Sequence, residues 1–117
     1  LVKNKNKNIN GYSKAFYSGI TTVRMGRIIN KIIKQNINLK GIYNISSIPI
    51  TKFELLNKLS NAFALNVDIT ENKNIKSNKV LISKKFTEIT GIKTPNWDDL
   101  ISEFVEDCEK NKSLYKN

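Results

Sequence analysis

The sequence contains no histidine and a single cysteine, Cys108. Without histidine the chain has no Ser-His or Cys-His nucleophile pair and none of the usual histidine metal sites. One cysteine forms neither an internal disulfide nor a thiolate zinc site, and this low cysteine content fits a reducing compartment. We therefore expect a cytoplasmic protein without a metal. Cys108 falls in an apolar helical stripe, which favours a buried structural thiol over a reactive one.

Glycine and long apolar runs are also scarce. The five glycines are too far apart for the dinucleotide-binding pattern or the P-loop. No run approaches the roughly 18 apolar residues of a membrane span, and residues 1–10 lack the apolar core of a signal peptide. The chain begins with Leu1, and its one methionine, Met25, lies inside a predicted helix. We therefore expect a piece of a longer protein with no membrane contact.

Positive charge is abundant but unevenly distributed. The formal net charge of the 117 residues is +10. Residues 1–60 hold eleven basic residues against one acid, whereas residues 61–117 hold nine of each. Clustered positive charge favours an anionic partner. The alternative explanation is compositional, because a chain dominated by Lys, Asn and Ile carries many solvated lysines.

The acids concentrate on the last predicted helix, which carries six of the ten. Aspartates near its start and lysines near its end complement the helix dipole. This arrangement indicates a solvated helix face rather than a pair of acid/base catalysts. The residue chemistry alone therefore predicts that the chain does not turn over a substrate by itself.

Four helices are predicted from apolar spacing and capping signals. Apolar residues at 25, 28, 29, 32 and 33 form one stripe and predict a buried helix face over residues 22–36. Thr and Glu three residues apart form a capping box for the second helix. The start and stop signals are Thr21 or Thr22 for the first helix, Thr51 with Glu54 for the second, Ser83 and Gly91 for the third, and Pro95-Asn96-Trp97 for the last.

Short extended segments are expected between these helices. Residues 42–46, 67–70 and 80–82 are apolar-rich or alternating, and residues 11–22 suggest extended backbone with a tight turn. Residues 1–10 are low in complexity and predict a loop or frayed segment. Together with the helices, these segments predict an α/β fold of mostly helices with a few short strands and no internal repeat.

Three stretches in this order resemble one family. They are Ser18-Gly19-Ile20-Thr21-Thr22 before a helix, residues 41–56 from Gly41-Ile42-Tyr43 to Glu54-Leu55-Leu56, and Thr90-Gly91-Ile92-Lys93-Thr94-Pro95-Asn96-Trp97. The set is similar to the C-terminal portion of the dTDP-4-dehydrorhamnose reductase-like sugar-nucleotide oxidoreductases, within the extended short-chain dehydrogenases/reductases. The resemblance spans about residues 9–117, and it rests on order and spacing rather than on a single motif.

The resemblance implies a division of labour. An N-terminal Rossmann domain, absent here, would bind NAD(P) and supply the catalytic Tyr-x-x-x-Lys pair; no tyrosine of this chain is followed by lysine four residues later. Residues 11–117 would form the C-terminal substrate-binding region of a reductase or epimerase in cell-surface polysaccharide sugar synthesis. A strand at about 42–45 would complete the edge of the parallel sheet. The chain itself would contribute no catalytic residue and would have its N-terminal domain as a partner.

The resemblance also implies residues for the sugar-nucleotide pocket. Aromatic side chains stack on a base or sugar face, and hydroxyl groups bond sugar or diphosphate oxygens. A lysine near the diphosphate acts as a point charge. Each of these residues also has a structural explanation as a core, turn or solvated side chain. The candidates are Tyr12, Phe16, Tyr17, Ser18 and Lys79.

A second hypothesis is a small basic module that binds nucleic acid or another polyanion. The charge on residues 1–60 supports it, whereas the absence of a helix-turn-helix spacing or an aromatic-and-basic sheet motif argues against it. Parallel strands need sheet neighbours and helices on both faces. We therefore expect the isolated chain to be marginally stable or associated, with exposed apolar surface around Ile42 and Ile45.

Overall fold

The computed structural model describes residues 7–114, which divide into two compact units. Unit 1 comprises residues 7–18 and 49–80, and unit 2 comprises residues 19–48 and 81–114. The elements are β1 (Asn8–Tyr17), α1 (Thr22–Lys34), β2 (Ile50–Thr51), α2 (Lys52–Ala62), β3 (Asp68–Lys79), α3 (Lys84–Thr90) and α4 (Trp97–Lys110).

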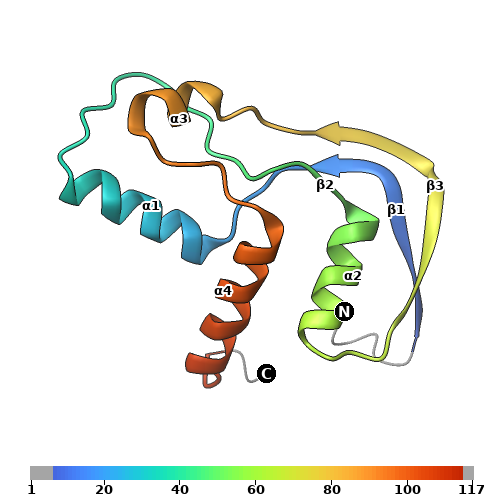
Figure 1. Ribbon diagram of the computed structural model, residues 1–117. Helices are drawn as coiled ribbons and strands as arrows, with labels where there is room; N and C mark the ends of the chain where they lie inside the picture. The colour runs from blue at the N-terminus through green and yellow to red at the C-terminus, as the bar shows by residue number, and fades with distance from the viewer. Residues whose placement is uncertain (1–6, 115–117) are drawn as a thin grey trace. The chain divides into compact units, whose positions relative to one another are not determined.

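Unit 1 is a small mixed sheet with one helix on one face. The strand order is β2-β1-β3, with β1 antiparallel to β2 and parallel to β3. The register pairs Asn8 with Asp68 at one end and Tyr17 with Lys79 at the other. β3 bulges at residues 73–75, between the partners of Tyr12 and Lys14. Figure 1 shows the two long strands curving side by side, with α2 next to them.

Gly11 sets how closely α2 approaches the sheet. A Cβ atom at this position would lie 2.6 Å from Cδ2 of Phe53 on α2 and 2.9 Å from Cγ2 of Ile69 on β3. Ala15, four residues along β1 and therefore on the same face, is 1% exposed. Small residues at these two positions let the helix lie directly on the strands.

The start of α2 is held by the predicted capping box. The Thr51 hydroxyl accepts a hydrogen bond from the Glu54 backbone N–H at 3.2 Å. The Glu54 carboxylate accepts in return from the Thr51 backbone N–H at 3.0 Å and from its hydroxyl at 2.8 Å. These bonds to the charged form lower the pKa of Glu54. The sequence prediction of this cap is confirmed.

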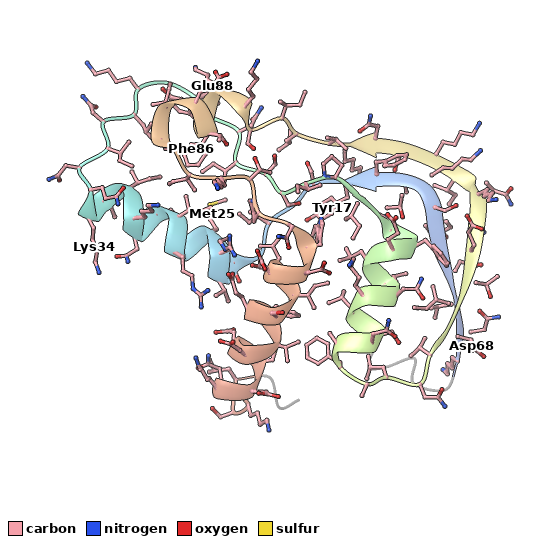
Figure 2. All side chains as sticks on the ribbon, in the orientation of Figure 1. Tyr17, Met25, Lys34, Asp68, Phe86 and Glu88 are labelled. Carbon is pink, nitrogen blue, oxygen red and sulfur yellow. The ribbon has the colours of Figure 1, made fainter. Side chains whose placement is uncertain are left out.

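Unit 2 is organised around Phe86. A small core is formed by Ile28 of α1, Phe86 of α3 and Ile92, with Tyr43 and Ile45 of the loop before β2 packed against it. The rings of Tyr43 and Phe86 meet edge to face, with centroids 6.5 Å apart. In Figure 2 the labelled Phe86 and Met25 extend from α3 and α1 into the space between these helices. Three segments that are distant in sequence therefore share one apolar cluster.

Polar contacts join α1 to α4 and hold the loop before β2. The Arg24 guanidinium donates to both carboxylate oxygens of Glu103, and Arg27 Nη1 lies 3.1 Å from the same carboxylate. The hydrogen bond from Arg24 is the main cause that lowers the pKa of Glu103. The Trp97 indole N–H donates to the Ile48 carbonyl at 2.8 Å. The predicted apolar stripe of α4 therefore also makes one polar contact, through the Trp97 indole N–H.

The strand predictions are partly wrong. Residues 42–46 form no strand, because no other described segment pairs with them, and residues 80–82 also lie outside the sheet. The prediction for 67–70 captured only the first residues of β3. Asn8–Asn10 belong to β1 rather than to a loop, since β3 supplies the pairing that their composition does not suggest; residues 1–6 lie outside the described part.

The helix predictions hold better. The Thr21 hydroxyl caps α1 through the Arg24 N–H at 3.3 Å, the cap of α4 is Asn96, and Gly91 ends α3 with a φ of 69°. The Ser83 hydroxyl, however, lies 3.0 Å from the Thr94 hydroxyl and does not cap α3.

The apolar surface of unit 2 differs from the prediction in extent. The buried stripe of α1 is narrower than predicted, because Ile29 and Ile33 are 48% and 67% exposed and do not belong to the core cluster around Phe86. Ile42 is 88% exposed, as expected, whereas Ile45 packs on the core. Cys108 is half-buried rather than buried, and burial, with the Asp107 charge, raises the pKa of its thiol.

Substitution of glycine by alanine is expected to have opposite effects in the two units. Gly11→Ala places a methyl group against Phe53 and Ile69 and should cost about 1–3 kcal/mol of unfolding free energy. Gly26→Ala lies inside α1 with open space around it and should stabilise by about 0.5–1 kcal/mol. Urea unfolding followed by far-UV circular dichroism measures both. Equal effects of the two substitutions would show that α2 does not approach β1 as closely as described.

The Arg24–Glu103 pair predicts an acid-dependent loss of stability. The folded pKa of Glu103 lies below its unfolded value, so the stabilisation is present above the ordinary carboxyl pKa of roughly 4.3 and is lost as the pH falls through the lowered value. Glu103→Gln should cost about 1–3 kcal/mol at pH 7, and its difference from the unchanged protein should shrink towards pH 3. Urea titrations with Trp97 fluorescence at several pH values measure this difference.

The matched control is Glu88→Gln. Glu88 forms an exposed pair with Lys84, one helical turn away, at 3.7 Å. Such pairs contribute about 0.3–0.5 kcal/mol. A Glu103→Gln effect as small as that of Glu88→Gln, or one independent of pH, would contradict the assigned role of the pair.

Candidate functional site

All five residues predicted for the pocket belong to unit 1 or to its boundary. Tyr12, Phe16 and Tyr17 lie on β1, Ser18 follows that strand directly, and Lys79 is the last residue of β3. The parallel register makes Tyr17 and Lys79 direct neighbours. Two of the candidates, which are 62 positions apart in sequence, therefore meet at the same end of the sheet.

The two faces of the β1–β3 ladder differ. Gly11, Ala15 and Ile69 define the α2 face, since they pack towards the helix or share its side of the strand. The opposite side, here called the open face, carries Lys14 and Phe16 on β1. Register partners in a sheet project on the same side, so Lys76 and Asn78 on β3 join them.

This division separates the predicted residues. Alternation along β1 places Tyr12 and Phe16 on the open face and Tyr17 on the α2 face with its neighbour Lys79. Phe16 is 44% and Tyr17 is 37% exposed. Ser18 is only 2% exposed, and its contact with a ligand stays a prediction. Four of the five candidates thus form two pairs on opposite sides of one ladder, and Ser18 follows β1 outside the ladder.

The open face contains a shallow depression that the sequence did not reveal. Its lining residues include two lysines, an aromatic ring and an amide, and they include no carboxylate. One signal was present in the sequence: Tyr12, Lys14 and Phe16 follow one another at every second position, which on a strand brings them to one face. The partners on β3 carried no such signal. The lining residues are Ser13, Lys14, Phe16, Lys76, Ser77 and Asn78.

Lys14 and Lys76 dominate the electrostatics of this depression. They are direct register partners on neighbouring strands. Neither ammonium group has a carboxylate partner among residues 7–114. The acids nearest along β3 are Asp68, at the far end of the strand, and Glu71, whose carboxylate pairs with Lys73 at 3.7 Å. The depression is therefore a site of unneutralised positive charge beside an aromatic side chain.

The described residues offer little other chemistry. Between residues 7 and 114 no group of three or more His, Cys, Asp or Glu side chains is placed to hold a metal ion. In the same part of the chain, no helix is both long and apolar enough to span a membrane. The raised pKa of Cys108 lowers its thiolate fraction, which does not favour a nucleophile. What the arrangement can do is bind an anionic or aromatic ligand.

Comparisons with known proteins bear on the fold. No family model and no curated protein sequence matches the chain. Among solved structures, the chain is similar to dTDP-4-dehydrorhamnose reductase from Bacillus anthracis in complex with NADP, with a TM-score of 0.74 and 16% identity. The match covers 91% of this chain and 40% of the reductase chain.

At this identity the likeness concerns the fold. The predicted fold class is confirmed. The chain forms a small α/β structure of helices and a mixed sheet, and 91% of the chain matches part of a solved reductase. The chain spans less than half of that reductase. It therefore has the fold of the C-terminal part of a dTDP-4-dehydrorhamnose reductase-like structure.

Proposed function

We propose that this chain is the substrate-binding portion of an NAD(P)-dependent sugar-nucleotide oxidoreductase. The observation that carries the proposal is the structural likeness to an NADP-bound dTDP-4-dehydrorhamnose reductase over 91% of the chain. The reaction would be a reduction or epimerisation that supplies sugars for cell-surface polysaccharides, in the cytoplasm. In this proposal the chain binds the substrate and the catalytic residues lie in another domain, because the chain has no Tyr-x-x-x-Lys pair.

The NAD(P) cofactor would be held by another domain. Unit 2 leaves large apolar side chains uncovered among the described residues: Ile33 is 67%, Ile42 88% and Ile82 75% exposed. Exposed apolar surface of this kind is typical of an interaction site. Residues 42–46 are rich in apolar side chains and belong to no strand within the described part, so a strand of an NAD(P)-binding sheet could pair with their backbone in the parallel arrangement.

The nucleotide sugar would be held by unit 1. Tyr17 and Lys79 lie next to each other where both parallel strands end, which is the usual position of ligands in α/β proteins. The Tyr17 hydroxyl is a donor and acceptor for a sugar hydroxyl, and the Lys79 ammonium is a positive charge for a diphosphate. Tyr12 and Phe16 lie on the other face of the ladder, and their contact with the ligand, like that of Ser18, stays a prediction.

Nuclear magnetic resonance titration of the 117-residue chain tests the proposal. With dTDP-glucose as the probe, we expect shifts of amide signals at the ends of β1 and β3 and little change at α4. NADP should shift few signals, because the glycine loop that would bind its pyrophosphate is lacking. Tyr17→Ala and Lys79→Gln should each weaken dTDP-glucose binding by about two- to five-fold, the value of one exposed contact.

The control variant is Lys34→Gln, which removes an exposed charge of α1 in unit 2. Its affinity for dTDP-glucose should equal that of the unchanged chain. Binding of a single-stranded oligonucleotide with a steep salt dependence, but not of dTDP-glucose, would instead support a basic nucleic-acid module. That result would refute the proposed function.

A further inference from the structure

Tyr17 and Lys79 belong to a row of residues that crosses the whole sheet of unit 1. Ile50 of β2 pairs with Tyr17 of β1, and Tyr17 pairs with Lys79 of β3. The row is weakly supported on the β2 side, because β2 consists of two residues and these make all of its pairing with β1. Strands in proteins usually have roughly three to ten residues. Contacts outside the ladder are therefore needed to hold Ile50 beside Tyr17.

A segment of unit 2 lies directly before β2 and is held by its own backbone hydrogen bonds. Residues 46–48, here called the brace, precede Pro49 and belong to unit 2. The Ile48 N–H donates to the Pro95 carbonyl at 3.0 Å, and the Ile48 carbonyl accepts from the Trp97 indole N–H at 2.8 Å. Both backbone groups of Ile48 are thus engaged within unit 2. The chain is consequently fixed two residues before Ile50.

The brace also holds the chain that follows β3. The Ser46 hydroxyl donates to the Leu81 carbonyl at 3.0 Å, and Leu81 comes two residues after Lys79. Ser46 is 2% exposed, so water does not compete for this bond. Through Ser46 and Ile48, the brace therefore connects the segment that enters β2 with the segment that leaves β3. These two strands flank β1 in the sheet.

The hydroxyl group of Ser46 has one printed partner and no part in the apolar core. The neighbouring Ile45 packs on the cluster around Phe86, whereas Ser46 does not belong to that cluster. An alanine at position 46 would occupy the same buried place without the bond to Leu81. The role of the hydroxyl is therefore the connection that it makes between the two chain segments.

We propose that Ser46, supported by Trp97, is a positioning residue for the Tyr17–Lys79 pair. Its bond to Leu81 ties the chain after β3 to the chain before β2, so the row stays paired. Tyr17 and Lys79 then present their polar groups to one ligand together. Side chains on separate strands form a binding site only when supporting contacts hold them in place. This inference rests on the proposed function, because it explains how the residues assigned to the nucleotide sugar are held.

Ser46→Ala tests the assignment, and Ser60→Ala is its matched control. Ser60 is also buried, at 6% exposed, and its hydroxyl donates to the Leu65 carbonyl at 3.0 Å beside the C-terminal end of α2. Loss of one such bond should lower the urea midpoint similarly in both variants, as measured by far-UV circular dichroism. Only Ser46→Ala should shift the amide signals of the row and speed its hydrogen exchange, because a local support acts on the segment that it holds.

Affinity for dTDP-glucose is the second readout. Ser46→Ala should weaken binding by about two- to five-fold, because a site that is only partly in its binding geometry loses apparent affinity in proportion. Trp97→Phe keeps a ring but removes the indole N–H, and it should act in the same direction. Ser60→Ala should bind as the unchanged chain does. In a chain that already carries Lys79→Gln, the effect of Ser46→Ala should be smaller, because both changes act on one contact pair.

Four outcomes decide the matter. If Ser46→Ala and Ser60→Ala behave alike in the amide signals of the row and in affinity, the Ser46 bond contributes only to stability and the inference is overturned. A disturbed row with an unchanged affinity in Ser46→Ala would overturn it as well. In both cases the unchanged chain still binds dTDP-glucose, so the proposed function survives. If the unchanged chain does not bind dTDP-glucose while Ser46→Ala alone disturbs the row, the proposed function fails and the positioning of the row by the brace stands.

Discussion

The parallel pairing of β1 with β3 is the constraint on which unit 1 depends. Parallel strands cannot be joined by a tight turn, and here residues 18–67 separate the end of one strand from the start of the other. The pairing decides which residues of two distant segments become neighbours. It places Tyr17 beside Lys79 and Lys14 beside Lys76, and it positions Ile69 next to the space that Gly11 leaves for α2. The Tyr17–Lys79 pair and the Lys14–Lys76 pair are both products of this one register.

The bulge at residues 73–75 determines which side chains of β3 share a face after it. Residues 73–75 of β3 lie opposite the single residue 13 of β1. Because β3 gains two residues, its side chains keep the same alternation on either side of the bulge, and the strand only bends. Lys76 and Asn78 consequently stay on the side opposite α2. A bulge also makes an edge strand a poor template for pairing with another chain. The same irregularity thus keeps the basic side chains together and protects the outer edge of β3.

Unit 2 buries only part of its apolar side chains. Its core is small, with Ile28, Phe86 and Ile92 at the centre, while several isoleucines and leucines on its surface are half or more exposed. Unit 2 also carries specific polar contacts, among them the part-buried Arg24–Glu103 pair and the Trp97–Ile48 hydrogen bond, whereas the buried Thr87 hydroxyl lacks a hydrogen-bond partner within the described residues. Exposed apolar side chains that lie together in one patch mark interaction sites. This supports the proposed partnership with an NAD(P)-binding domain.

The sequence by itself determined the local structure and the chemistry that is excluded. Capping by Thr21 and by Thr51 with Glu54, and the left-handed end at Gly91, follow from contacts within a few residues, so composition and spacing suffice to predict them. The absence of histidine and of the glycine motifs likewise excludes whole classes of catalyst. The order of motifs also pointed to the fold that the structural comparison supports.

Only the tertiary structure decided the strands and the sites. Asn8–Asn10 and residues 71–79 are mostly polar, yet they form strands because β1 and β3 pair with each other along their lengths. Residues 42–46 are rich in apolar side chains but form no strand, because no described strand pairs with them. The separation of Tyr12 and Phe16 from Tyr17 and Lys79, and the meeting of Lys14 with Lys76, depend on the register and on the position of α2. Neither is encoded in local spacing, because a sheet joins residues by pairing across the fold rather than by their distance along the chain.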